Sequence, residues 1–319
     1  AYIYIFIIFL GIPATFLYNL TAGILRSLGD SITPVIFLVG SSIVNIILDL
    51  ILVVPMGVAG AAVATVASQA VSGIICTIYM TKKLKYLEFS KEDWTFSMRH
   101  CLKLCGMGLP MGLQYSITAI GSVILQTAVN DMGSTYVAAV SAGSKISMFM
   151  CCPFDAMGST MATYGGQNVG ARRLDRVDQG LKACIKMGII YALVALAFSI
   201  VFGKQLALLF VKKEQIELIG YIYEFVVINA AFYIFLALVN IVRFMIQGLG
   251  YSTFAILAGI CEMIARSVVG FICVSLGSPL AWVCADLFLI PAYLWVMKQL
   301  RRKFGGNKIS RAKSATATI

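Results

Sequence analysis

The chain has 319 residues, of which 60% are hydrophobic and only 12% are charged. Soluble globular domains are roughly 45–50% apolar and about 25% charged, so this composition excludes an ordinary soluble domain. The formal net charge is +11. The basic residues lie mostly between apolar runs, which favours orientation in a membrane over nucleic-acid binding.

Apolar segments long enough to be membrane-spanning helices recur along the whole chain, each near the length of about 20 residues that a bilayer requires. There are nine of them, at residues 2–25, 33–54, 58–80, 105–130, 135–160, 180–203, 219–247, 252–275 and 279–299. Pro13, Pro110 and Pro153 do not argue against helices, because neighbouring helices can satisfy the freed backbone groups, and these prolines are candidate kinks. The sequence therefore predicts an all-α polytopic membrane protein.

The connectors between these segments alternate in charge. Basic residues gather in 81–100, in 165–178 and after the last segment. Because cytoplasmic loops carry the excess of Lys and Arg, these three regions are predicted to be cytoplasmic. Nine crossings then put the start of the chain outside, at the edge of a helix and without an initiator Met, so we expect a further amino-terminal part to precede it.

An internal repeat relates two parts of the chain. The stretch "YNLTAGILRSLGDS" (18–31) aligns with "VNIVRFMIQGLGYS" (239–252) at an offset of 221 residues, which pairs Asn19 with Asn240 and Gly29 with Gly250. An even number of crossings separates the copies, so the repeat is parallel. It predicts two six-helix lobes, with nine of the twelve helices present. Residues 1–98 would hold the last three helices of the amino-terminal lobe, 99–300 the carboxyl-terminal lobe, and 301–319 a basic cytoplasmic tail.

Five stretches of the chain are distinctive as an ordered set: "LRSLGDSITPVIFLVGSSIVNIILDL", "GVAGAAVATVASQ", "GLPMGLQYSITAIGSVILQTAVNDMG", "GGQNVGA" and "IQGLGYSTFAILAGICEMIAR". Together they resemble the multidrug and toxic compound extrusion (MATE) family. The resemblance implies twelve helices in two lobes around a cleft that opens to alternate sides. It also implies export of cationic or amphipathic organic compounds, driven by entry of Na⁺ or H⁺. On this map the chain lacks about the first three helices.

A carboxylate inside an apolar segment is the first candidate for a functional site. Asp49 and Asn45 are four residues apart and share one helix face. Ionisable residues in membrane spans are costly and usually face a cavity or a partner. A carboxylate and an amide oxygen suit Na⁺, and a buried carboxylate suits H⁺; a hydrogen bond for packing near the interface is the alternative. The resemblance adds that the archaeal branch of the family uses an Asn and an Asp at this spacing in a cation site.

Other polar residues in the predicted spans are candidates for lining a cavity, with packing hydrogen bonds as the alternative. They are Asn19, Thr65, Gln114, Gln126, Asn130 and Asp155. Glu262 and Arg266, again four apart, predict a structural or gating ion pair rather than a direct role in coupling. The sequence assigns no partner to Asp155 or to Asp286. Thr118 and Leu236 stand where the sodium-coupled bacterial branch has acidic residues, which weakens a Na⁺ site of that type in the second lobe.

No catalytic constellation appears in the sequence, which has one His and nine Cys without metal-ligand spacing. We therefore expect no enzyme and no cofactor, with H⁺ or Na⁺ as a coupling ion. The leading hypothesis is a cation-coupled antiporter in the cell membrane, a monomer that contacts membrane lipid, binds organic cations or drugs and does not bind nucleic acid. The alternatives are a flippase of lipid-linked saccharides and a non-transporting membrane scaffold. A flippase cavity should be cationic, whereas basic residues at membrane depth are few.

Overall fold

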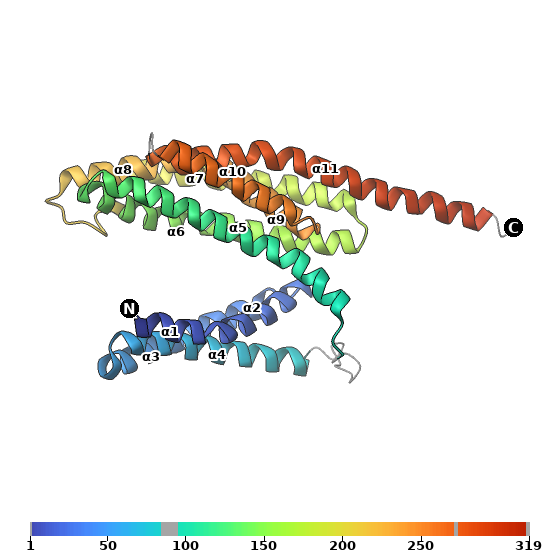
Figure 1. Ribbon diagram of the computed structural model, residues 1–319, viewed down its shortest axis with the longest axis horizontal. Helices are drawn as coiled ribbons and strands as arrows, with labels where there is room; N and C mark the ends of the chain where they lie inside the picture. Colours follow the sequence, from blue (N-terminus) through green and yellow to red (C-terminus); the bar gives the residue numbers. More distant parts are fainter. Residues whose placement is uncertain (1, 84–94, 271–273, 317–319) are drawn as a thin grey trace. The chain divides into compact units, whose positions relative to one another are not determined.

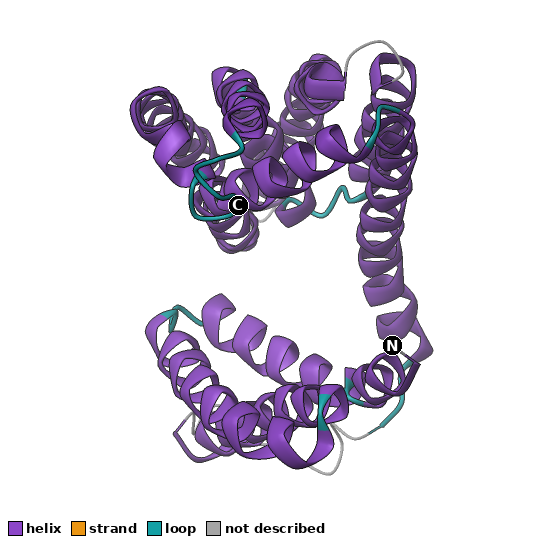
Figure 2. Ribbon diagram, turned by 90° about the vertical axis from the view of Figure 1, so that its left-hand side faces the viewer, coloured by secondary structure: helices purple, strands orange, loops and turns teal. Residues whose placement is uncertain are grey.

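The computed structural model describes residues 2–83, 95–270 and 274–316, and every regular element in these ranges is an α-helix (Figures 1 and 2). The chain divides into two compact units, Ala1–Ser97 and Met98–Ile319. This architecture confirms the predicted all-α fold.

The first unit contains four helices: α1 (Tyr2–Leu10), α2 (Ile12–Ser27), α3 (Ile32–Met56) and α4 (Val58–Lys83). Helix α4 packs against the other three. A Cβ atom on Gly73 of α4 would lie 3.1 Å from the backbone N of Tyr18, so α2 and α4 approach closely at this glycine. The buried Ser41 hydroxyl of α3 donates to the carbonyl of Ser68 on α4 at 2.9 Å. Small residues and hydroxyls of this kind are typical of helix packing in membranes.

The second unit contains seven helices. They are α5 (Met98–Asp131), α6 (Ser134–Gly170), α7 (Leu174–Ala207), α8 (Ile216–Ala231), α9 (Tyr233–Gly248), α10 (Thr253–Gly270) and α11 (Val274–Thr316). Most residues of α9 are buried, and this helix packs against α6, α7, α10 and α11. Phe154, Tyr233, Met245 and Leu289 are among the fully buried side chains of the core around it. The functional groups on α9 are therefore held by packing on several sides.

Within the described ranges, six helices are individually long and apolar enough to cross a membrane, and the bent pairs α1–α2 and α8–α9 qualify as two more spans. The predicted segments 2–25 and 219–247 are thus each a pair of helices joined at a bend, of 43° and 50° respectively. At the first break a Cβ on Gly11 would lie 2.3 Å from a Val66 methyl, so α4 occupies the space beside the bend. Pro13 follows within the first turn of α2, where a proline is tolerated. The predicted segment 252–275 contains α10 and then enters residues 271–273, which lie outside the described residues.

The helix boundaries repeat at the offset that the sequence predicts. Adding 221 carries both ends of α2 onto both ends of α9, and carries the break at Gly11 onto Phe232. The helix ends are capped alike: Gly29 has φ +96° and Gly250 has φ +91°. The following backbone N–H of Asp30 donates to Leu25, and that of Tyr251 to Ile246. These are the bonds of a helix end closed by a left-handed glycine. The two units therefore share one backbone plan.

Candidate functional site

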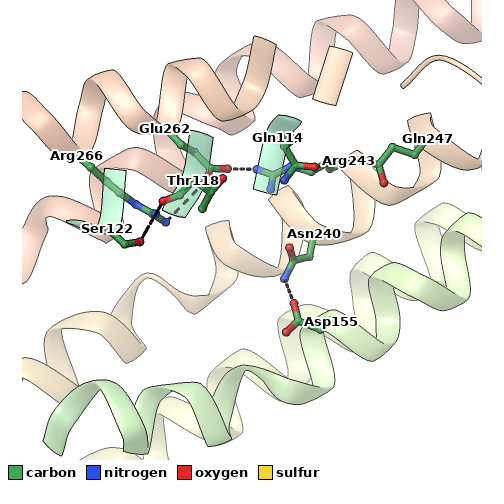
Figure 3. A network of polar contacts seen from close by, with 9 residues as sticks. All are labelled: Gln114, Thr118, Ser122, Asp155, Asn240, Arg243, Gln247, Glu262 and Arg266. Carbon is green, nitrogen blue, oxygen red and sulfur yellow. Dashed lines mark hydrogen bonds and ion pairs between the residues drawn. The ribbon is translucent and has the colours of Figure 1, made fainter. Parts of the chain in front are cut away.

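A network of polar side chains crosses the interior of the second unit (Figure 3). It draws residues from four helices, and the spacing of four on α5 and on α10 puts each helix's contributors on one face. The members are Gln114, Thr118 and Ser122 on α5, Asp155 on α6, Asn240, Arg243 and Gln247 on α9, and Glu262 and Arg266 on α10.

Glu262 lies between two arginines. Its Oε1 pairs with Nη2 of Arg243, and its Oε2 lies 3.7 Å from Nη2 of Arg266. All three residues are at least nine-tenths buried. Charges buried this deeply are tolerated when they are paired, whereas a buried charge without a partner destabilises the fold. The structure thus contains the predicted contact between Glu262 and Arg266, and it adds Arg243 as a second partner that no spacing rule within one helix could find.

Arg266 and Gln247 extend the network to α5. Nη1 of Arg266 donates to the Thr118 carbonyl and to Ser122 Oγ, both at 3.3 Å. Gln247 Nε2 donates to Gln114 Oε1 at 3.2 Å, and both glutamines are buried. The predicted cavity residue Gln114 therefore makes a hydrogen bond between helices. These contacts tie α5, α9 and α10 together.

Two further carboxylates lie near Arg243, and each interacts with it electrostatically. Asp155 is exposed on the second unit, and its Oδ1 accepts a hydrogen bond from Asn240 Nδ2 at 3.0 Å. Asp286 on α11 is only 4% exposed. Neither of its carboxylate oxygens has a hydrogen-bond partner among the described residues. The two carboxylates thus differ sharply in solvation and pairing.

Gln126 and Asn130 lie on α5 outside this network. Gln126 Nε2 donates to Asn130 Oδ1 at 3.1 Å, and both residues are exposed on the second unit. Their predicted role in lining a cavity stays a prediction.

The first unit holds its own polar pocket of about 390 Å³ between α2, α3 and α4. Asn19, Asn45 and Thr65, three of the predicted residues, line it together. Asn19 and Thr65 also make local bonds, to the carbonyls of Thr15 at 3.0 Å and Ala61 at 2.9 Å. The remaining lining residues are Thr15, Tyr18, Arg26, Leu38, Ser41, Ser42, Ser68, Gln69 and Ser72. The wall is therefore rich in hydroxyl and amide groups.

Asp49 is outside the lining of that pocket, one helical turn from Asn45. It is half-buried, and α3 contains no other charged residue. Oδ1 of Asp49 and Nδ2 of Asn45 are both buried without a hydrogen-bond partner among the described residues. A hard cation takes about six oxygen ligands, so these two side chains supply part of a Na⁺ site, whereas a proton needs only the carboxylate.

The fold and these buried charges define a class of protein. Membrane-spanning helices in two units with one repeated plan, and ionisable side chains inside the spans, are typical of secondary transporters.

Comparison with known families identifies the family. The MatE family model matches residues 110–272, about half of the chain, so the chain belongs to the MatE family of transporters. The model of the lipid II flippase MurJ matches residues 2–127. The resemblance seen in the sequence is thereby confirmed, and the prediction that the protein is not an enzyme agrees with the family.

Relatives and solved structures agree with this assignment. The chain is 30% identical over 239 residues to "Probable multidrug resistance protein YpnP" of Bacillus subtilis (strain 168), covering 71% of this chain and 53% of that protein. It is 27% identical over 223 residues to "Probable multidrug resistance protein YoeA" of the same strain, covering 66% and 47%. The chain thus spans about half the length of these curated relatives. A crystal structure of MATE in the bent conformation has the same fold, with a TM-score of 0.83 at 22% identity, over 94% of this chain and 69% of that one.

Proposed function

We propose that the protein works as a cation-coupled exporter of organic cations or other amphipathic drugs in the cell membrane. The observation that carries this proposal is Asp49: a half-buried carboxylate with an unpartnered Oδ1, on a helix without any other charged residue. An ionisable group in such a place is a candidate for ion binding. Membership of the MatE family and the names of the curated relatives support export of drugs.

In this proposal, coupling arises because the coupling ion and the organic cation compete for the negative charge of Asp49. The ionised Asp49 carboxylate favours a cation in the lobe, whereas H⁺ or Na⁺ on the carboxylate removes that attraction. A coupling ion changes the equilibrium between two conformations only through its different affinity for each of them. Asp49 would supply that difference in affinity, because an ionised carboxylate is unfavourable in a conformation that shields it from water. Asn45, one turn away, would orient the carboxylate or the bound ion.

Asp49→Asn tests the proposal in cells that express the full-length transporter. The amide keeps the size of the side chain and removes its titratable charge, so ion-driven export should be lost while the protein still folds. Asp175→Asn is a matched control, because Asp175 pairs with Arg173 where both side chains are more than half exposed. Undiminished drug resistance in cells carrying Asp49→Asn would refute the coupling role.

A flippase of lipid-linked saccharides is the second candidate. It is favoured by the MurJ match over residues 2–127, and by Arg26 beside hydroxyls and amides in the wall of the first unit's pocket. A guanidinium and hydroxyl groups suit a phosphate and a sugar. In proteoliposomes, movement of a fluorescent lipid-linked saccharide that falls on Arg26→Gln, without ion-driven export of cationic dyes, would favour this candidate. Dye export without saccharide movement would exclude it.

The orientation is also a proposal: 81–100, 165–178 and the carboxyl terminus face the cytoplasm. The positive-inside rule supports it. Arg172, Arg173 and Arg176 lie in the connector between α6 and α7 and at the start of α7. A cysteine introduced at position 172, in a background whose native cysteines are replaced, should react with an impermeant maleimide only after the cells are opened. Labelling of intact cells would reverse the orientation.

A further inference from the structure

Asp286 has the surroundings of an apolar core residue. It lies on α11 at 4% exposure, among the buried side chains of Trp282, Ala285 and Leu289. Both carboxylate oxygens are buried, and neither has a hydrogen-bond partner among the described residues. An ionised carboxylate without partners in such a place is strongly unfavourable. Taking up a proton removes this cost, whereas Na⁺ would need about six oxygen ligands.

The buried ion group of Arg243, Glu262 and Arg266 has a net positive charge. Arg243 and Arg266 carry two positive charges, and Glu262 carries one negative charge. An ionised Asp286 makes the sum over these four buried groups zero, and a protonated Asp286 leaves one positive charge. Asp155, which also acts on Arg243, is exposed and bonded to Asn240, so it is not counted among the buried groups. Arg243 uses Nη2 for Glu262, whereas its Nε is buried without a partner in the described part of the chain. One side of this guanidinium therefore remains available to respond to Asp286.

Arg243 is the group whose charge acts on Asp286. Helices α5, α8, α9 and α10 pack against α11, and Asp178 of α7 contacts it two turns further along. Tyr233 of α9 packs against this part of α11, with its ring centroid 6.4 Å from that of Trp282, and its buried hydroxyl has no hydrogen-bond partner among the described residues. Further charged or titratable groups on these helices include Tyr115 on α5, Glu217 and Glu224 on α8, and Glu262 and Arg266 on α10. Asp178 bonds to Tyr293 and Arg301. The charge state of Asp286 is thus set by its apolar surroundings and by the charge of Arg243.

From this arrangement we infer that Asp286 is a second proton-binding site of the transporter, in the second unit, and that its proton alters the pairing of Arg243 with Glu262. This inference rests on the proposed function, because the proton comes from the same driving gradient. On the side where protons enter, H⁺ from water binds one Oδ of the carboxylate and forms the neutral acid; on the other side it returns to water and restores the anion. Arg243 is drawn towards Asp286 in the ionised state and pairs with Glu262 alone in the protonated state. Because Glu262 also holds Arg266, the change reaches α10 and α5.

Infrared spectroscopy of the full-length transporter in lipid tests the protonation directly. A protonated carboxylic acid has a C=O stretch that a carboxylate lacks, and raising the pH should remove it. Asp286→Asn should delete one such band, and Asp286→Glu should shift it, which keeps the test decisive if the first variant does not fold. Asp178→Asn is the matched control. Asp178 also contacts α11, but its carboxylate accepts hydrogen bonds from Tyr293 Oη at 2.8 Å and from Arg301 Nη2 at 2.5 Å. The Asp178→Asn variant should therefore leave the C=O band unchanged.

Transport in the same proteoliposomes separates this inference from the proposed function. Export of a cationic dye driven by a pH gradient should fall on Asp286→Asn by about 5- to 150-fold, the usual range for coupling between two sites, while dye binding persists. A band that neither Asp286 variant changes would overturn the inference even if the wild type exports dye. A lost band with undiminished export would overturn the coupling role of the site. If the wild-type protein moves dye at the same rate with and without the pH gradient, the proposed function is wrong. The C=O band would still show whether Asp286 binds a proton.

Discussion

Glu262→Ala should destabilise the second unit more than any loss of a surface ion pair. It leaves the guanidinium groups of Arg243 and Arg266, both at least nine-tenths buried, without the carboxylate between them. Breaking a buried pair by removing one partner costs about 3–5 kcal/mol. Arg266 keeps its bonds to Thr118 and Ser122, and each such bond is worth about 1 kcal/mol. We therefore expect a loss of about 3 kcal/mol, at the lower end of that range.

The free energy of unfolding can be measured in mixed micelles by titration with a denaturing detergent, with tryptophan fluorescence as the signal. Trp282 is buried in the same unit and reports on it. The control is Asp175→Ala, which breaks a pair whose side chains are 54% and 58% exposed; exposed pairs contribute about 0–1 kcal/mol. If Glu262→Ala costs no more than this control, the reasoning from buried charge is wrong.

Two further tests address the packing of helices, one through the space around two glycines and one through a hydrogen bond between helices. A Cβ on Gly248 would lie 2.2 Å from the Ala162 carbonyl oxygen, so Gly248→Ala should force α6 and α9 apart and lower stability by about 1–3 kcal/mol. Gly112→Ala on α5, where a Cβ meets nothing within 4 Å, should be neutral or stabilising by up to about 1 kcal/mol; equal melting temperatures for the two variants would contradict this reading. Ser41→Ala removes the 2.9 Å bond to the Ser68 carbonyl and should cost about 1 kcal/mol, measured in the same detergent titration; a gain in stability would contradict it.

The sequence predicts a helix well where the length and apolar composition of a segment are enough to require one. The segments that became α3 to α7 are long apolar runs, and a bilayer accepts such runs only as helices. The break at Phe232 was missed for a local reason. Gly11 and Pro13 mark the first bend, but Phe232 carries no glycine or proline signal. Only the repeat, which maps Gly11 onto Phe232, contains the information for the second bend.

The candidate site was predictable only where its contacts stay within one helix. Glu262 and Arg266 are four residues apart on α10, so helical spacing brings them together. Arg243 reaches Glu262 from another helix, 19 residues away in the sequence. Asn240 and Asp155 are 85 residues apart. Such contacts depend on how α6, α9 and α10 pack, and no pattern along a single helix encodes that packing.

The proposed function requires that an ion gradient drive the export of organic cations. The most direct measurement is the movement of a cationic dye across proteoliposomes that contain the full-length transporter, with an imposed proton or sodium gradient and with the gradient collapsed by an ionophore. We expect fast, gradient-dependent dye movement that Asp49→Asn abolishes. Dye movement at the same rate with and without either gradient would contradict it.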